Sequence, residues 1–434
     1  MAASHTALLP PEGRRLETPA RATLLAHYAE TERFSKIILA GEVCITVAAL
    51  LWVSFGTIQV PDAWPWVAAT LGGLGVFRWI AQHVFLNKKR LEDIRADASF
   101  GVHNKQSLLA LVQRVFSRLQ LPPDAAPVFM TRAKDVNAMA VRCELLPGLR
   151  VFNGVYLNRA IIHLLDEPEL ESVVGHELGH VFPYAPLLSR SYLLHSAFAA
   201  SVSFALAATF NHGAVAVIAP LALLWVLDWI IAFPHIRISR GIEFLCDDFG
   251  AKAAGLLPAL SSEFKINAES EARQQIIFHL LQTAAQGGKV PLDQLMEDYE
   301  AAVPFGRSDP ASVRAEMEKL ASSRNLSRGG VSLTGFVRFL GERDVDDDDY
   351  KESVGNEAKR LELLATLPLV PIDRESYLKD SSAWTTAKAC ELITVIENNP
   401  TTVLFHLADE ITDKVSSHPG VSRRMLFLWR NQQT

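Results

Sequence analysis

The sequence is poor in cysteine and has no strong excess of charge. Its 434 residues include four cysteines, none in a CxxC pair, and its formal net charge is −6 at pH 7. The scattered cysteines argue against a disulfide framework or a cysteine zinc cluster and favour a reducing compartment. The mild charge does not favour nucleic acid as a partner. The segment 1–36 is polar and charged, so we expect no cleavable signal peptide.

Apolar residues are in excess, at 49% of the chain, and they gather in four runs. Each run is close to the ~20 residues that a helix needs to cross a bilayer. Buried core helices are the alternative, but four such lengths in two hairpins are more typical of membrane spans. The predicted spans are 37–60, 64–86, 192–210 and 214–233.

The positions of Lys and Arg predict how the spans are oriented. The links 61–63 and 211–213 carry neither residue, whereas the opposite flanks do. By the positive-inside rule, both termini and the segments 87–190 and 235–434 lie in the cytosol. We expect a multi-pass protein, most simply of a bacterial inner membrane. The flanking cations are Arg33, Lys36, Lys88, Lys89, Arg90, Arg190, Arg237 and Arg240.

Charged side chains inside spans need partners. Glu42 and Arg78 lie at depths that differ by about 4–5 Å at 1.5 Å per residue, so we predict that they pair. A proton or ion path is the functional alternative. His195 and Asp228 lie near the cytosolic ends of their spans, where we expect structural hydrogen bonds.

The cytosolic part alternates between helix and strand patterns. We predict a helix at 18–36, with Thr18 as N-cap, and an amphipathic helix at 104–120. Period-two patterns predict three strands, the last two joined as a hairpin, and hence a small antiparallel sheet. These strands are 127–131, 137–142 and 149–154.

The stretch "DEPELESVVGHELGHVF" at 166–182 predicts another helix. It opens with a capping box in which Asp166 is the N-cap and Glu169 stands three residues on. Its expected buried stripe is Leu170, Val174, Leu178 and Val181.

His176 and His180 project from one face of this helix, about 6 Å apart along the axis. Two imidazoles so placed can share a tetrahedral zinc ion at ~2.0–2.1 Å each, and Glu177 can reach a water on that ion. A helix with two surface histidines is the alternative. Gly175 and Gly179 argue against it, since each costs ~1 kcal/mol in a helix interior and would serve a close approach.

A third ligand is expected in "SRGIEFLCDDFGAKAAG" at 239–255. Glu243 can complete a His₂Glu site for one Zn²⁺ per chain. Asp247, one turn later, can accept a hydrogen bond from a ligand imidazole. The second predicted hairpin leaves and re-enters the same side of the membrane, so it can bring this segment to the two histidines.

Together these motifs resemble the HtpX-type integral-membrane zinc metallopeptidases, in the group that includes the CAAX prenyl endopeptidases. The resemblance covers the organisation of 37–255 and then 416–424. Cys246 stands where an alanine is usual, and Met139 where a phenylalanine is usual. The motifs are "NAMA" at 137–140, "HELGH" at 176–180, "SRGIEFLCDD" at 239–248 and "SSHPGVSRR" at 416–424.

The resemblance implies roles for individual residues. His176, His180 and Glu243 would bind zinc, and Glu177 would be the general base. Asn137 and His418 would hydrogen-bond the substrate or the oxyanion, although His418 fits a turn before Pro419 equally well. An edge strand would pair with an extended peptide, and its residues would be Arg150, Val151, Phe152 and Asn153.

The expected fold is α+β but mostly α, with four transmembrane helices and a cytosolic zincin-like domain holding the small antiparallel sheet. The segments predicted are an N-terminal helix at 1–36, a transmembrane hairpin at 37–86, the first part of the peptidase domain at 87–190, a second hairpin at 191–234, the third-ligand helix at 235–255, a helical insertion at 256–415 and the "SHPG" segment at 416–434.

The resemblance implies a membrane-embedded zinc endopeptidase that cleaves membrane or misfolded proteins on the cytosolic side, in protein quality control. A CAAX-type prenyl peptidase is the nearest alternative, but that group has more spans. A catalytically silent scaffold is another, and the complete set of site residues argues against it. A transporter would account for Glu42 and Arg78 but for none of the cytosolic motifs.

Overall fold

The computed structural model describes residues 17–55, 88–131, 136–142, 153–185, 238–285, 368–400, 402–405 and 419–432, together with the single or paired positions 187, 194–195, 198, 201–202 and 205. Several predictions therefore fall outside the described residues. They are the spans at 64–86 and 214–233, most of the span at 192–210, the residues Arg78 and Asp228, the segment 149–152 and His418.

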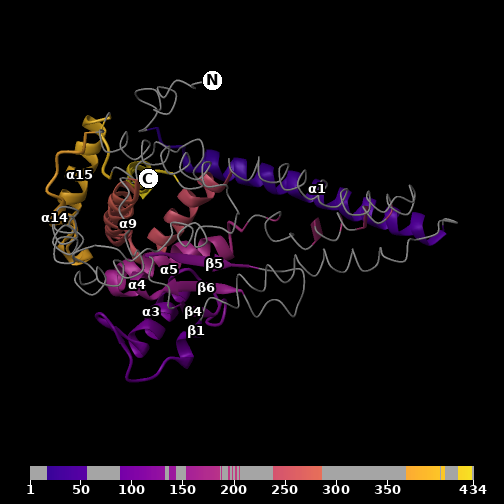
Figure 1. Cartoon of the computed structure of the whole chain (residues 1–434), viewed down its shortest axis with the longest axis horizontal. Coiled ribbons are helices and arrows are strands. Elements are labelled where there is room, and N and C mark those ends of the chain that lie inside the picture. The colour runs from indigo at the N-terminus through magenta and orange to yellow at the C-terminus, as the bar shows by residue number, and fades with distance from the viewer. Residues whose placement is uncertain are drawn as a thin grey trace.

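The first helix is continuous through the predicted cytosolic segment and into the first apolar run. α1 (Arg21–Phe55) extends well beyond the body of the protein (Figure 1). It begins at Arg21 rather than after Thr18, whose hydroxyl instead accepts a hydrogen bond from Arg430 Nη1 at 3.0 Å. In its outer part Ile37 is 69% exposed and Trp52 59% exposed, as suits a lipid-facing surface.

Within the part of the chain that the structure describes, α1 is the one helix long and apolar enough to cross a membrane, over Arg21–Trp52, and its most apolar 18-residue window has a mean hydropathy of 1.9. One polar contact fixes its buried side. His195 Nδ1 donates to the Glu42 carboxylate at 2.7 Å, and both side chains are buried. The hydrogen bond predicted for His195 is thus present, and Glu42 is its partner.

The sheet is mixed rather than antiparallel, and its strand order is β1-β4-β6-β5. β6 (Gly154–Asn158) lies between β4 (Val128–Thr131), to which it is parallel, and β5 (Ala138–Val141), to which it is antiparallel. β1 (Lys89–Arg90) pairs antiparallel with β4. After the edge strand β5 the chain returns as β6, which lies between β5 and β4. The hairpin prediction includes the antiparallel pairing of β6 with β5 but not its parallel pairing with β4.

This topology corrects one strand prediction. The partner of β5 is Gly154–Asn158, which begins only at the last residue of the predicted 149–154. The pocket-side edge among the described strands is β5, and the edge strand predicted at 150–153 falls mostly outside the described residues and stays a prediction. Gly154 begins β6 with φ 155°, and a Cβ there would clash with the carbonyl oxygen of Pro127. Only glycine tolerates such a close approach of β6 to the residue that precedes β4.

Helices cover the sheet and build a core with it. α3 (Lys105–Arg118) starts with a capping box between Asn104 and Ser107, and its predicted apolar face is buried against α5 (Glu167–Val181) and the sheet. The smaller neighbouring elements are η3 (Leu91–Asp93), β2 (Ser99–Phe100), β3 (His103–Asn104) and α4 (Arg159–Leu164).

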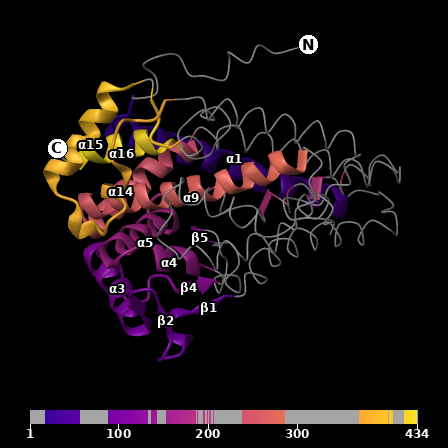
Figure 2. The ribbon, with the colours of Figure 1, turned by 60° about the vertical axis from the view of Figure 1, so that its left-hand side comes forward.

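A second core lies on the other side of α5. α9 (Leu256–Ala285) runs along α5 and contacts α16 (Val421–Gln432) (Figure 2). Phe264 of α9 packs its ring against the aromatic rings of three residues from the C-terminal part: Tyr377, Trp384 and Phe405. The remaining elements here are α14 (Arg374–Tyr377), η5 (Ser381–Ala383) and α15 (Thr386–Asn398).

Candidate metal centre

The helix α5 begins as the sequence predicts, with reciprocal hydrogen bonds between Asp166 and Glu169. The sequence does not reveal how deeply this cap is buried. Glu169 is fully buried and also accepts hydrogen bonds from Ser261 and Lys265 of α9, the latter at 2.8 Å. Asp166 Oδ2 accepts from Ser381. The start of α5 is therefore fixed to two distant parts of the chain.

The two glycines of α5 let a second helix approach closely, as predicted. Residues 238–254 are helical and cross α5 at this point. A Cβ on Gly175 would stand 2.8 Å from Ala253 Cβ, and a Cβ on Gly179 would stand 2.9 Å from Cys246 Sγ. The predicted stripe of α5 is buried as well: Leu170, Val174, Leu178 and Val181. This crossing places the two histidines next to the third candidate ligand.

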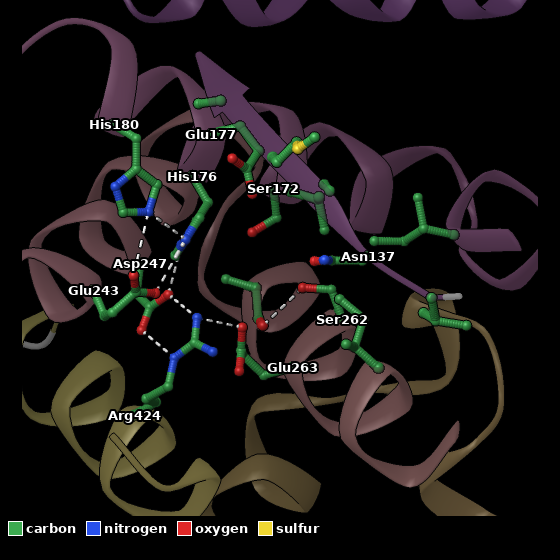
Figure 3. Close-up of a pocket in the computed structure, with 18 of the residues that line it drawn as sticks. Asn137, Ser172, His176, Glu177, His180, Glu243, Asp247, Ser262, Glu263 and Arg424 are labelled. Carbon is green, nitrogen blue, oxygen red and sulfur yellow. Dashed lines mark hydrogen bonds and ion pairs between the residues drawn. The ribbon is translucent and has the colours of Figure 1, made fainter. Parts of the chain in front are cut away.

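The ligand atoms of His176, His180 and Glu243 converge on one point (Figure 3). The two imidazole Nε2 atoms are 3.2 Å apart, and they lie 3.5 and 3.4 Å from the nearest Glu243 carboxylate oxygens. Ligands held at 2.0–2.1 Å in a tetrahedral shell are separated by about 3.3–3.4 Å. The donor set and its spacing therefore fit a zinc ion.

Asp247 holds the outer nitrogen of one candidate ligand. His176 Nδ1 lies 2.8 Å from Asp247 Oδ1, which places the proton on Nδ1 and leaves Nε2 as a metal donor. Burial alone would lower the pKa of His176, but its hydrogen bonds with Asp247 and Glu243 outweigh burial and raise that pKa well above its usual value. A metal bound at Nε2 would therefore displace the proton that faces Glu243. The predicted contact between Asp247 and a ligand imidazole is thus present.

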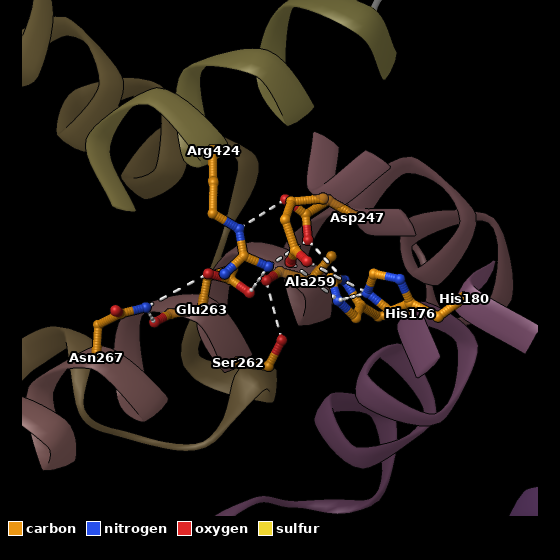
Figure 4. A network of polar contacts seen from close by, with 9 residues as sticks. His176, His180, Asp247, Ala259, Ser262, Glu263, Asn267 and Arg424 are labelled. Carbon is orange, nitrogen blue, oxygen red and sulfur yellow. Dashed lines mark hydrogen bonds and ion pairs between the residues drawn. The ribbon is translucent and has the colours of Figure 1, made fainter. Parts of the chain in front are cut away.

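Two charged residues at the site were not predicted. Arg424 of α16 donates from Nε to Asp247 Oδ2 at 2.8 Å and from Nη2 to Glu263 Oε1 at 2.7 Å (Figure 4). Burial alone would raise the pKa of Asp247, but Arg424 holds it below its usual range. Burial raises the pKa of Glu263 to about 7, against the opposing effect of Arg424. Arg424 ends the "SSHPGVSRR" stretch, which was the one available signal for it.

A pocket of about 610 Å³ opens beside the three candidate ligands. Glu177, which is buried, lines it next to His176, and Asn137 faces it from the strand side (Figure 3). The edge strand β5 forms one wall. Of the residues predicted to border the substrate, Arg150, Val151, Phe152 and His418 lie outside the described residues, and Asn153 directly precedes the internal strand β6.

The pattern of residues and the fold agree with the comparison to known families. Residues 102–430 match the model described as "Peptidase family M48". The chain belongs to peptidase family M48. This membership implies a metallopeptidase acting on polypeptides, and the His176–His180–Glu243 group could hold the metal ion that such an enzyme needs.

A curated relative of this M48 chain is similar over part of its length. The protein described as "Protease HtpX homolog" from Desulforapulum autotrophicum is 24% identical over 193 residues, which cover 42% of this chain and 58% of that protein. The match thus spans little more than half of the relative. No solved structure matches the chain.

Proposed function

We propose that this M48 protein is a membrane-embedded zinc endopeptidase that cleaves membrane or misfolded polypeptides on the cytosolic side of the membrane. The observation that carries the proposal is the convergence of three ligand atoms, at spacings suited to a tetrahedral ion, beside a buried glutamate in an open pocket. A zinc ion held by His176, His180 and Glu243 would polarise the substrate carbonyl and acidify a water molecule.

The remaining residues have roles that complete this chemistry. Glu177 takes a proton from the attacking water and delivers a proton to the leaving amine. Asn137 lines the pocket, where its amide can hydrogen-bond the substrate. We assign the same type of contact to His418 from the sequence motif, since it lies outside the described residues. β5, half-buried and at the edge of the sheet among the described strands, offers an edge to which an extended peptide can add as a further strand. Main-chain pairing of this kind suits unfolded segments of varied sequence.

The test is cleavage of a loosely folded protein such as casein by the purified, zinc-supplemented chain, compared with a Glu177→Gln variant. We expect the rate to fall by roughly 10²–10⁴-fold, because proton transfer is lost while the metal ligands remain. Zinc content should stay at one ion per chain in both proteins. The matched control is Glu167→Gln, on the same helix but at the surface, where its partner is Arg114. Equal cleavage by parent and Glu177→Gln would refute the proposal.

A further inference from the structure

Glu263 is a buried carboxylate at the site for which the proposed function has no role. It lies on α9, lines the pocket and is 9% exposed. Its Oε1 accepts from Arg424 Nη2 at 2.7 Å, and its Oε2 lies 3.4 Å from Asn267 Nδ2. Burying a carboxylate costs free energy unless the group is paired, so a buried glutamate beside the site suggests that it acts on the neighbouring residues.

The contacts of Glu263 lead to a candidate zinc ligand. The Nη2 group that Glu263 holds also donates to Asp247 Oδ1, and Asp247 Oδ1 is 2.8 Å from His176 Nδ1. Figure 4 shows these four side chains in one continuous line of polar contacts. They come from four helical segments, namely α9, α16, 238–254 and α5. A change in how the Arg424 hydrogen bonds are divided between Glu263 and Asp247 therefore alters the hydrogen bond that Asp247 makes with the His176 imidazole.

The effect of this sharing has a definite sign. If the Arg424 guanidinium bound Asp247 alone, it would neutralise more of the carboxylate's negative charge. Asp247 would then be a weaker hydrogen-bond acceptor for His176. Glu263 takes part of the guanidinium, so Asp247 keeps a stronger hold on the Nδ1 proton and His176 stays a better electron donor. This sharing of Arg424 therefore strengthens metal binding.

We propose that Glu263 is a positioning residue that raises the zinc affinity of this site by acting through Arg424 and Asp247 on His176. The inference rests on the proposed zinc site. A merely structural role, in which Glu263 fixes α9 to α16, would change the stability of the fold but leave the zinc affinity of the folded protein unchanged. Zinc affinity therefore separates the two roles.

The experiment measures the zinc dissociation constant of the full-length protein in nanodiscs by competition with a chromophoric chelator. We expect Glu263→Gln to weaken zinc binding by about 3- to 10-fold, less than the 10–100-fold typical of a group that contacts a ligand directly. The matched control is Glu397→Gln, since Glu397 also pairs with an arginine of α16, Arg430 at 2.5 Å, but at an exposed position. It should leave the zinc affinity unchanged.

A double-mutant cycle tests the route of the effect. In an Arg424→Gln background, Glu263→Gln should change zinc affinity by less than about twofold, because its link to Asp247 is gone. If Arg424→Gln does not fold, Glu263→Asp is measured instead, because aspartate keeps the charge but its shorter side chain no longer reaches Arg424. A zinc affinity as weak as that of Glu263→Gln would support the proposal, and the parental affinity would overturn it.

Other outcomes are equally decisive. An unchanged dissociation constant with a lowered melting temperature would show that Glu263 is only structural, and an equal loss in both backgrounds would show that it does not act through Arg424. Failure of the parent itself to bind zinc would instead overturn the proposed function, and so the two failures are distinguishable.

Discussion

At the scale of single residues, the sequence identified those site members that share a helix. His176 and His180 are separated by one turn of α5, as Glu243 and Asp247 are on their helix, so helical periodicity alone puts each pair on one face and Glu177 beside the first pair. Arg424 and Glu263 escaped because their contacts with Asp247 and with each other join helices far apart in the chain. Such pairings depend on how the helices pack, and no local pattern encodes that.

The contact between His176 and Asp247 gives the first prediction. Asp247→Asn should weaken zinc binding by roughly 10–100-fold, because the amide accepts the Nδ1 proton less strongly and leaves Arg424 with only one of its two ion-pair partners, Glu263. Equilibrium competition with a chelator measures the change. Asp248→Asn is the matched control: Asp248 is also buried and paired, but with Arg21 and Lys252. Equal losses in the two variants would contradict the role given to Asp247.

At the scale of elements, most helices and two strands followed from the sequence, since capping boxes and apolar stripes are local signals. The capping box predicted at Asp166 formed, and the helix predicted at 104–120 begins with a capping box between Asn104 and Ser107 that was not predicted. The order of the sheet did not follow, because the parallel pairing of β4 with β6 passes over the intervening β5. The choice of edge strand depends on that long-range pairing.

The crossing of α5 with 238–254 gives a second prediction. Gly179→Ala should destabilise the zinc-loaded protein by about 1–3 kcal/mol, because the added Cβ would stand 2.9 Å from Cys246 Sγ and 3.2 Å from Cys246 Cα. Thermal unfolding in detergent measures it. Cys246→Ala removes the sulfur and should restore part of the loss in the double variant. A stability equal to that of the parent in Gly179→Ala would mean that the helices are not in close contact.

The buried ion pair between α5 and α9 gives a third prediction. Lys265 Nζ lies 2.8 Å from Glu169 Oε2, and both side chains are buried. Lys265→Met should destabilise the fold by roughly 3–5 kcal/mol, because it leaves a buried carboxylate without its cation. Lys265→Met with Glu169→Gln should recover most of this, since glutamine keeps the capping box and carries no charge. If the double variant is less stable than Lys265→Met alone, the loss of stability comes from packing rather than from the unpaired charge.

The same pair predicts how stability depends on pH. Burial raises the pKa of Glu169, even though Lys265 opposes this. A carboxyl whose folded pKa exceeds its unfolded value disfavours folding when it ionises, so its contribution is most favourable below the unfolded pKa and is lost as the pH rises toward the folded pKa. Without the lysine the folded pKa is higher still. Lys265→Met should therefore lose more stability at pH 8 than at pH 5, relative to the parent, in denaturation at both values.

At the scale of the whole molecule, the division of the chain into membrane and cytosolic segments remains a prediction. Its support is the exposed apolar length of α1 and the distribution of Lys and Arg around the apolar runs. The helix α9 belongs to the segment predicted as an insertion, and yet it packs on α5 and supplies Glu263 to the site. The length of the segment 256–415 and its lack of a recognisable motif therefore did not predict that its first helix would contribute to the site.

Three cysteines at different depths provide the fourth prediction, which concerns topology. Cys44 is exposed on the outer part of α1, Cys390 is exposed on α15, and Cys246 is buried between α5 and its crossing helix. The experiment uses variants that keep one of these three cysteines and have serine at the other cysteine positions, Cys143 included. A membrane-impermeant maleimide is added to intact cells and to inverted membrane vesicles.

Cys390 should react in inverted vesicles and not in intact cells, because the positive flanks place α15 on the cytosolic side. Cys44 should react in neither, since lipid covers a residue that the bare chain exposes, and it should react fully once the protein is unfolded in detergent. Cys246 serves as the control for protection by protein rather than lipid. Reaction of Cys44 from either side would mean that α1 does not span the bilayer, and reaction of Cys390 in intact cells would reverse the orientation. In the second case the peptidase site would face away from the cytosol, and the substrates proposed for it would have to be sought on the other side of the membrane.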